Sequence, residues 1–363
     1  MGEAPPALNP HPSVYPQPNE MKTRLGSLLA LGLALGAALD LSAARKEVNL
    51  FGWSEYVPQA VLDQFKEETG ITVNYETYAS NEEMLSKLLS GAGDYDLVQP
   101  SEYVIESLVK ADKLAAIDFA NVPNIRNISP AYLHRPHDPE QKYSVPYMVG
   151  AISIVVNTER VKEPVTGFKD VFSGKYAGRI VSLNDNRELL TWALQTLGRD
   201  FNAVTPENIA AARPLLEKWL PQVKIFDSDS PKTKLLNGDV DIGIVWPGEA
   251  AILYREDKKF ACLLPVEGSH VTIDSLVIPK EAPHKAEAEA FINFILRPEI
   301  SVLISRAFPY TNPNTEACKL LTPEELANPA SFPPGVETLP TFKAIGQAAA
   351  QVDKLITDLK SGS

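Results

Sequence analysis

The sequence is poor in the residues and motifs by which most catalytic and metal-binding proteins are recognised. It has two cysteines and five histidines in 363 residues, too few and too scattered for a metal framework. It contains no GxGxxG after a strand, no GxxxxGK(S/T), no HExxH and no GxSxG pattern. The sequence therefore gives no signature of a nucleotide-binding loop, a zinc protease or a serine hydrolase, and it indicates neither a cofactor nor a metal.

Positive charge is also scarce. There are 34 lysines and arginines against 46 acidic residues, which gives a net charge of −12. This balance disfavours nucleic acid as a partner and is compatible with a cationic ligand. The length and the ordinary hydrophobic content of 44% suit a globular chain folded into two lobes.

The two cysteines, Cys262 and Cys318, leave two possibilities open. In an exported protein they can form one disulfide. They can equally be two separate buried thiols, and their spacing in the sequence does not decide between these states.

One apolar run lies near the N-terminus. Basic residues follow Met21, residues 25–39 are apolar, and small residues stand at positions 42–44. This order predicts a secretory signal peptide, with a buried helix as the alternative, and the run is too short and too rich in Gly and Ala for a membrane span. We expect residues 1–44 to be an N-terminal extension plus signal peptide, with Met21 as the true start.

Helix and strand patterns alternate through the rest of the chain. Residues 61–69 are amphipathic and end at Gly70, residues 71–75 alternate like a strand, and Ser80 with Glu83 forms a capping box before a buried helix face. Repeated strand-helix-strand units predict a mostly parallel sheet flanked by helices. Further strands are expected at 95–98, 151–156, 180–183, 240–246 and 274–279, further helices at 103–113, 188–197, 209–219, 285–296, 299–307 and 342–359, and a Pro-rich connection at 143–147.

The segment 51–58 brings unusual chemistry to a strand-to-helix turn. Trp53, Glu55 and Tyr56 supply an indole, a carboxylate and a phenol there. Open α/β sheets bind ligands at such turns, and an aromatic face beside a carboxylate suits an organic cation. The alternative is ordinary packing of Trp53 and Tyr56 under the following helix.

Several short segments in a fixed order carry a family resemblance. They are Trp53-Ser54-Glu55-Tyr56-Val57-Pro58, Tyr95-Asp96-Leu97-Val98 with Pro100-Ser101, Tyr143-Ser144-Val145-Pro146-Tyr147, Asp185-Asn186-Arg187-Glu188, Asp227-Ser228-Asp229, Val245-Trp246-Pro247-Gly248, Asp274-Ser275-Leu276, Phe294-Ile295-Leu296-Arg297-Pro298 and Tyr310-Thr311-Asn312-Pro313-Asn314. With these segments, the chain from about residue 48 to 359 resembles the periplasmic spermidine/putrescine-binding proteins of ABC-type polyamine importers.

The resemblance implies an α/β fold, a two-lobed periplasmic-binding-protein clamp of type II. Each lobe would be a mostly parallel sheet flanked by helices, with hinges where the chain crosses over. Residues 45–150 and 272–318 would form lobe one, and 151–271 and 319–363 lobe two. The implied role is a monomeric periplasmic receptor, not an enzyme, that captures a polyamine between the lobes and hands it to a membrane ABC permease.

The resemblance also implies a set of ligand-binding residues. The acids are Glu55, Asp185, Glu188 and Asp274; the aromatic residues are Trp53, Tyr56, Tyr103, Trp246 and Tyr310; the polar residues are Ser54 and Ser228; and Glu249 adds an acid that putrescine-specific relatives share. Carboxylates would pair with ammonium groups whose unpaired burial costs several kcal/mol each, and rings would contribute about 0.5–2 kcal/mol. Without the resemblance, Asp185 and Glu188 are better interpreted as acids at a helix N-terminus. Trp192 and Trp219 lie in helical patterns and are expected in the core.

Two departures from the family pattern leave the choice of polyamine open. Thr272 stands where the spermidine binder of the family has a tryptophan, and the ligand-binding glutamine of the family tail falls near Phe342 or Lys343. The alternatives are a receptor of the same fold for another small cationic or zwitterionic solute, for example an amino-acid-like or metal-chelate solute, a secreted hydrolase with a scattered triad, and a polyamine sensor. Four acids in one site argue against an anionic substrate.

Overall fold

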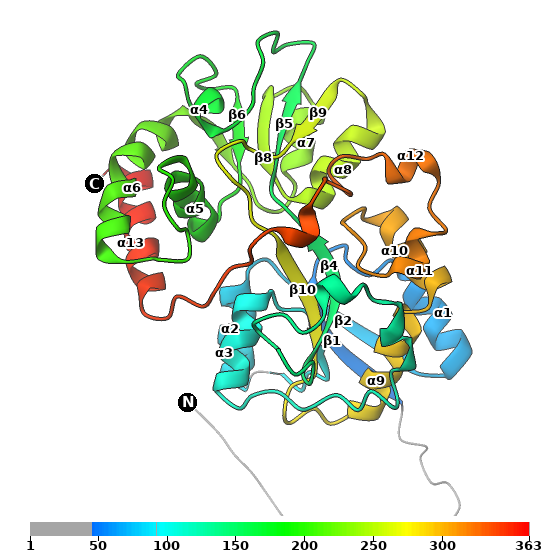
Figure 1. Ribbon diagram of the computed structural model, residues 1–363. Helices are drawn as coiled ribbons and strands as arrows, with labels where there is room; N and C mark the ends of the chain where they lie inside the picture. Colours follow the sequence, from blue (N-terminus) through cyan, green and yellow to red (C-terminus); the bar gives the residue numbers. More distant parts are fainter. Residues whose placement is uncertain (1–45, 92, 363) are drawn as a thin grey trace, which may run out of the picture. The chain divides into compact units, whose positions relative to one another are not determined.

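The computed structural model describes residues 46–362 except Ala92 (Figure 1). The signal peptide expected within residues 1–44 lies outside the described residues. The described chain builds two five-stranded sheets, each flanked by its own helices. In the part of the chain that is described, no helix combines the length and the apolar character needed to cross a membrane.

Sheet one has the strand order β2-β1-β3-β10-β4. The strands are β1 (Glu47–Trp53), β2 (Thr72–Tyr78), β3 (Leu97–Val98), β4 (Ser144–Gly150) and β10 (Thr272–Val277). β1 pairs in parallel with β2 and β3, whereas β10 runs antiparallel to both β3 and β4. The carboxyl ends of β1 and β3 therefore meet at one edge of the sheet.

Sheet two has the strand order β7-β6-β8-β5-β9. The strands are β5 (Ser153–Asn157), β6 (Ile180–Ser182), β7 (Val223–Phe226), β8 (Ile242–Val245) and β9 (Phe260–Leu263). β6 is parallel to β7 and β8, and β5 is antiparallel to β8 and β9.

The predicted α/β arrangement of two sheets with flanking helices is present, but each sheet is half parallel and half antiparallel rather than mostly parallel. Parallel neighbours need a crossover connection within one sheet. β10 and β5 instead enter their sheets from segments that come from the other sheet, and both run antiparallel to their neighbours.

Residues 143–147, expected as a connection, contain the start of a buried strand, β4. This strand lies at the edge of sheet one, and Pro146 pairs with Ser275 next to a register shift in β10. Edge strands and bulges are the places where a sheet tolerates proline. The proline therefore did not mark a loop here.

The helices beside sheet one, apart from the short last one, which was not predicted, begin and end close to the predicted residues. They are α1 (Gln59–Thr69), α2 (Asn81–Leu89), α3 (Glu102–Lys110), α9 (Lys285–Ile295), α10 (Pro298–Ala307) and α11 (Thr315–Cys318). Gly70, with φ of 73°, ends α1, and the Ser80 hydroxyl accepts the Glu83 N–H at 3.1 Å. Phe65 is fully buried against α9, and burying such a side chain contributes about 1.5–3 kcal/mol.

The helices beside sheet two enclose a second core. They are α4 (Phe168–Val171), α5 (Asn186–Thr196), α6 (Pro206–Trp219), α7 (Pro231–Leu236), α8 (Pro247–Glu256) and α13 (Ala348–Ser361), while α12 (Pro323–Leu326) and 3-10 turns at Pro123–Asn127, Pro130–Tyr132, Leu220–Gln222 and Val336–Thr338 lie in connecting segments. Trp192 and Trp219 are 1% and 3% exposed and stack on Phe168 and Phe172. Their predicted place in the core is confirmed.

The chain passes between the two sheets at three places, and one buried acid joins two of them. Glu102, at the start of α3, accepts the N–H of Ile273 at 2.9 Å and the N–H of Phe342 at 3.0 Å. Burial raises the pKa of Glu102 to about 7, although these N–H groups oppose the shift. Figure 1 shows the chain after α12 running past β10 toward α13. The predicted helix over 342–359 begins only at Ala348, because the N–H groups of Phe342 and Ala344 are bonded to acids of α3.

The division of the chain into lobes at 150, 271 and 318 stays a prediction. The segment after α11 contacts the helices and core of both sheets. The Asn328 amide donates to the Ala251 carbonyl of α8, beside sheet two, at 2.9 Å, whereas Val336 packs in the core beside sheet one.

The two cysteines are separate thiols. The Cys262 thiol donates to the Ala250 carbonyl at 3.3 Å and the Cys318 thiol to the Asn312 carbonyl at 3.5 Å. Burial raises the pKa of Cys262 to about 12, so this thiol is unreactive at neutral pH.

Candidate functional site

The first part of the candidate site lies where β1 and β3 end. Trp53 is the last residue of β1, and its indole N–H donates to the Gln99 carbonyl just beyond β3 at 3.0 Å. Its ring lies edge-on to Tyr78, with ring centroids 4.6 Å apart. These contacts hold the indole at the edge of sheet one where the sequence predicted a ligand-binding turn.

Ser54 and Glu55, which form the turn after Trp53, are exposed. Glu55 adopts a φ of 64°, in the left-handed region that non-glycine residues seldom occupy. Its carboxylate Oε2 lies 3.7 Å from the ammonium Nζ of Lys232 in α7. The turn therefore directs this acid toward the sheet-two side.

Asp274 of β10 is buried in a network of neutral groups. Its Oδ2 accepts the Tyr56 hydroxyl at 2.7 Å, and its Oδ1 accepts the Ser101 hydroxyl at 2.6 Å. Asn81 donates in turn to the hydroxyls of Ser101 and Tyr103, both at 3.0 Å. Burial raises the pKa of Asp274 to about 6 although both hydroxyl bonds oppose the shift.

An aromatic wall adjoins Asp274. The Tyr56 ring lies edge-on to Tyr310, with centroids 5.4 Å apart. A Cβ added to Gly248 of α8 would lie 2.4 Å from the Tyr310 ring, so only glycine permits this contact. The start of α8, on the sheet-two side, thus packs directly on the wall that carries Tyr56 and Tyr310.

Asp185 caps α5 on the sheet-two side. Its Oδ1 accepts the Glu188 N–H at 2.9 Å. Burial, and then the charge of Glu188, raise the pKa of Asp185 to about 7, although part of its surface stays accessible. The charge of Asp185 contributes, after burial and Glu82, to raising the pKa of Tyr103 in α3. The charge of Asp185 therefore acts on a residue of the sheet-one side.

Glu188 is engaged inside the sheet-two side. It is 2% exposed, its Oε1 lies 3.0 Å from His270 Nε2, and its Oε2 accepts the Trp192 indole N–H at 3.1 Å. Both carboxylate oxygens therefore have partners in the protein, and the role of Glu188 as an amine ligand stays a prediction.

Trp246 and Ser228 are joined to each other. The Trp246 indole N–H donates to the Ser228 carbonyl at 2.8 Å, and the Trp246 ring packs against the cores of both sheets. The Ser228 hydroxyl accepts the Asn184 N–H at 2.8 Å, which fixes the loop that leads to Asp185. Ser228 thus positions its neighbours through both its carbonyl and its hydroxyl.

Glu249 already has a cationic partner. It is 1% exposed, its Oε2 accepts the Lys232 backbone N–H at 2.8 Å, and its Oε1 contacts the Lys232 ammonium. Burial raises the pKa of Glu249, with Lys232 opposing the shift. The predicted additional acid is present but paired.

Phe342, rather than Lys343, lies among the site residues. Its ring is buried, 6.0 Å from Tyr103 and 4.2 Å from His270 between centroids, with the Arg187 guanidinium 4.8 Å away. Lys343 is exposed. The tail therefore presents an aromatic ring where a lysine would have repelled a polycation.

Comparison with known proteins decides the family. Residues 60–334 match the model of the bacterial extracellular solute-binding proteins. The chain belongs to this family. It is 36% identical over 348 residues to the spermidine/putrescine-binding periplasmic protein of Salmonella typhimurium, covering 94% of this chain and all of the relative. The corresponding Escherichia coli protein is 37% identical over 340 residues, covering 91% and 97%.

A solved structure supports the same assignment. The spermidine/putrescine ABC transporter substrate-binding protein PotD of Streptococcus pneumoniae superposes with a TM-score of 0.76 at 31% identity, covering 87% of this chain and 99% of that one. The two-lobed α/β class predicted for this solute-binding protein is thereby confirmed.

Sequence reasoning missed four residues of the candidate site of this solute-binding protein: Asn81, Ser101, Lys232 and His270. Ser101 stood inside a segment that carried the resemblance, so its position was a usable signal. The other three had no such signal: Asn81 stood inside the predicted capping box, which gave it only a role at the helix start, Lys232 follows a proline in an unpredicted helix, and His270 lies in a connecting segment. Among the described residues, no cluster of three or more His, Cys, Asp or Glu is placed to hold a metal ion.

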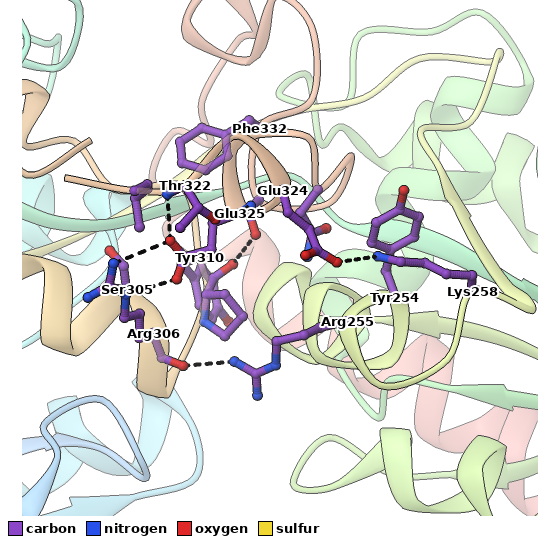
Figure 2. Close-up of a pocket in the computed structure, with 14 residues that line it drawn as sticks. Tyr254, Arg255, Lys258, Ser305, Arg306, Tyr310, Thr322, Glu324, Glu325 and Phe332 are labelled. Carbon is purple, nitrogen blue, oxygen red and sulfur yellow. Dashed lines mark hydrogen bonds and ion pairs between the residues drawn. The ribbon is translucent and has the colours of Figure 1, made fainter. Parts of the chain in front are cut away.

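A separate cavity of about 290 Å³ lies between α8, α10 and α12 of this solute-binding protein (Figure 2). Of the predicted site residues, only Tyr310 lines it. Most of its charges pair within the cavity wall: Arg306 binds Glu325 at 2.8 Å, and Lys258 lies 3.9 Å from Glu324, whereas Arg255 pairs with Glu256 outside the wall. Because these charges are already paired, the cavity is a poorer site for a charged solute than the candidate site that contains Tyr56 and Asp274.

Proposed function

We propose that this protein is a periplasmic polyamine receptor that binds spermidine, putrescine or a related amine between its two lobes. It delivers the amine to a membrane ABC permease, acts as a monomer and catalyses no reaction. The proposal is supported by relatives of 36–37% identity whose names specify spermidine and putrescine, and by the chemistry of the acids described above.

The observation that carries the proposal is the environment of Asp274. This carboxylate is 6% exposed, and its two hydrogen-bond donors, Tyr56 and Ser101, are neutral hydroxyls. A buried carboxylate without a cation is costly to ionise. An ammonium group bound beside it would supply the missing charge, and the rings of Tyr56 and Tyr310 would face the methylene chain.

Asp185 provides a second acid of the same kind. Its donors are backbone N–H groups, and burial, followed by the charge of Glu188, raises its pKa to about 7. Asp185 lies on the sheet-two side and Asp274 on the sheet-one side. A ligand with an ammonium group at each end would therefore hold both sides together, as hinge closure requires.

One observation favours a second candidate, a zwitterionic solute bound by the same fold. The Nη1 of Arg187 is buried and has no hydrogen-bond partner among the described residues, and burial lowers the pKa of this guanidinium. A ligand carboxylate could satisfy this donor, because arginine pairs strongly with carboxylates.

Calorimetric titration of the purified chain separates these candidates. We expect heat of binding with putrescine and with spermidine and none with glutamate. A series of diamines of increasing length would then show an optimum set by the separation of the acids. Glutamate binding with silent polyamines would favour the zwitterion, and silence with both polyamines would refute the proposed function.

A further inference from the structure

One lysine occupies the acidic site of a protein proposed to bind cations. Lys232 is the second residue of α7, and its backbone N–H and its ammonium both contact Glu249. The same ammonium lies 3.7 Å from the carboxylate of Glu55 on the sheet-one side. A single side chain therefore joins acids from both sides of the site.

This lysine is charged and largely enclosed. The side chains of Lys232 and Glu249 are 17% and 2% exposed. Burial alone would lower the pKa of Lys232, but the hydrogen bond and charge of Glu249 outweigh burial and raise it. The side chain thus carries an ammonium group throughout the neutral pH range.

Glu249, the acid that holds this ammonium, follows directly on the residue that packs against the aromatic wall. α8 begins directly after Trp246, and its second residue, Gly248, packs on the Tyr310 ring. The charge of Glu249, the next residue, contributes to raising the pKa of Tyr310. Lys232 is therefore held by carboxylates of the type proposed to hold an ammonium group of the ligand, and one of them adjoins the aromatic wall.

Counting charges shows which acids stay available. Glu249 and Glu55 share Lys232, and Glu188 is bonded to His270 and Trp192. Asp185 and Asp274 form no ion pair in the part of the chain that the structure describes, and their hydrogen-bond partners are neutral groups, although the charges of Lys360 and Arg187 act on Asp185 from a greater distance. Of the predicted acids, two carboxylates, one on each side, are thus left for the ligand.

We infer that Lys232 is a resident ammonium that fills one amine position of the site and makes the receptor select diamines over triamines. The inference rests on the proposed function and adds the ligand's charge and length to it. A diamine matches the two free carboxylates. A third ammonium would meet the like charge of Lys232 and would have to displace it from two acids.

The test compares Lys232→Ala with a matched control, Lys234→Ala. Lys234 lies on the same helix, and its ammonium is 3.9 Å from Asp227, outside the acids of the site. We expect wild type to prefer putrescine over spermidine in calorimetry. Lys232→Ala frees Glu55 and Glu249 for a third ammonium, so the ratio of spermidine to putrescine affinity should rise about tenfold or more. Lys234→Ala should leave this ratio unchanged.

A double variant, Lys232→Met with Glu249→Gln, covers the case in which the unpaired Glu249 destabilises the single variant. The double variant removes the Lys232 ammonium and the buried Glu249 carboxylate together. Only Glu55 is then free to pair with a third ammonium, so the ratio of spermidine to putrescine affinity should rise by less than in Lys232→Ala. If a folded variant still binds putrescine but its ratio of spermidine to putrescine affinity is unchanged or lower, the role inferred for Lys232 is overturned. The proposed function is not affected by that result. A wild type that binds neither polyamine would refute the proposed function and the inference with it.

Discussion

At the scale of single residues, the surroundings of Asp274 say most about the ligand. The carboxylate is buried, it is hydrogen-bonded on both oxygens, and its pKa is raised to about 6 because burial outweighs those bonds. A site built for an anion would place arginine, lysine or a helix N-terminus at this position. The neutral hydroxyls instead orient the acid and leave its charge to be compensated by a cation.

Replacing Asp274 with Asn should weaken binding of putrescine by about 2–5 kcal/mol, because a ligand ammonium would lose its charged partner in an enclosed site. Calorimetry on the purified variant measures this loss. The exposed Asp239→Asn change removes the same charge from the surface and should leave the affinity unchanged. Equal affinities of Asp274→Asn and wild type would place the ligand elsewhere.

The sequence was sufficient to place residues of local motifs, such as Trp53 and Tyr56, at the turn after β1, while their role in binding stays a prediction. It did not reveal the partners that complete them. Ser101 and Asp274 are 173 residues apart in the chain, and Lys232 and Glu249 are joined through two helices that had no clear pattern. Such contacts depend on the tertiary fold, which single-sequence patterns do not specify.

At the scale of secondary-structure elements, α3 does more than cover sheet one. Its first residue, Glu102, accepts N–H groups from β10 and from the tail, and Glu106 one turn later accepts the Ala344 N–H at 3.1 Å. Helices with clear caps and buried faces, such as α1 and α2, were predicted to within a few residues. The start of β4 was missed because Pro146 was interpreted as a sign of a loop. The start of α13 was misplaced because the backbone before it is hydrogen-bonded to acidic side chains of α3.

Glu102→Ala should lower the free energy of unfolding by about 1–3 kcal/mol for each N–H group left unsatisfied, since buried donors without partners are costly. Denaturant unfolding monitored by circular dichroism measures the change. Glu67→Ala on the exposed face of α1 serves as the control and should stay within about 0.5 kcal/mol of wild type. A loss no larger than that of the control would show that the crossings do not depend on this acid.

At the scale of the whole molecule, the candidate site draws one incompletely compensated acid from each side. The pKa values of Asp274 and Asp185 are raised to about 6 and about 7 in the free protein. A bound ammonium favours the ionised form of each acid and so lowers these pKa values again. The complex therefore holds fewer protons than the free protein between about pH 4 and pH 7.

Polyamine binding should accordingly release protons at pH 6 and become tighter as the pH rises from about 5 to about 7, with little further gain from these acids above that range. Calorimetry at pH 6 in two buffers of different ionisation enthalpy detects the release as a difference in observed heat. At pH 8 the two buffers should give the same heat. Proton uptake at pH 6 would contradict the proposed pairing of amines with Asp185 and Asp274.

The single carboxylate of Glu102 anchors both the start of β10 and the segment before α13, and this has a mechanical consequence. If one lobe swings against the other, Ile273 and Phe342 cannot bend independently, because both backbones are tied to the same fixed point at the start of α3. Such a swing would be confined to a common pivot, and the two sides of the candidate site would return to the same alignment each time they meet.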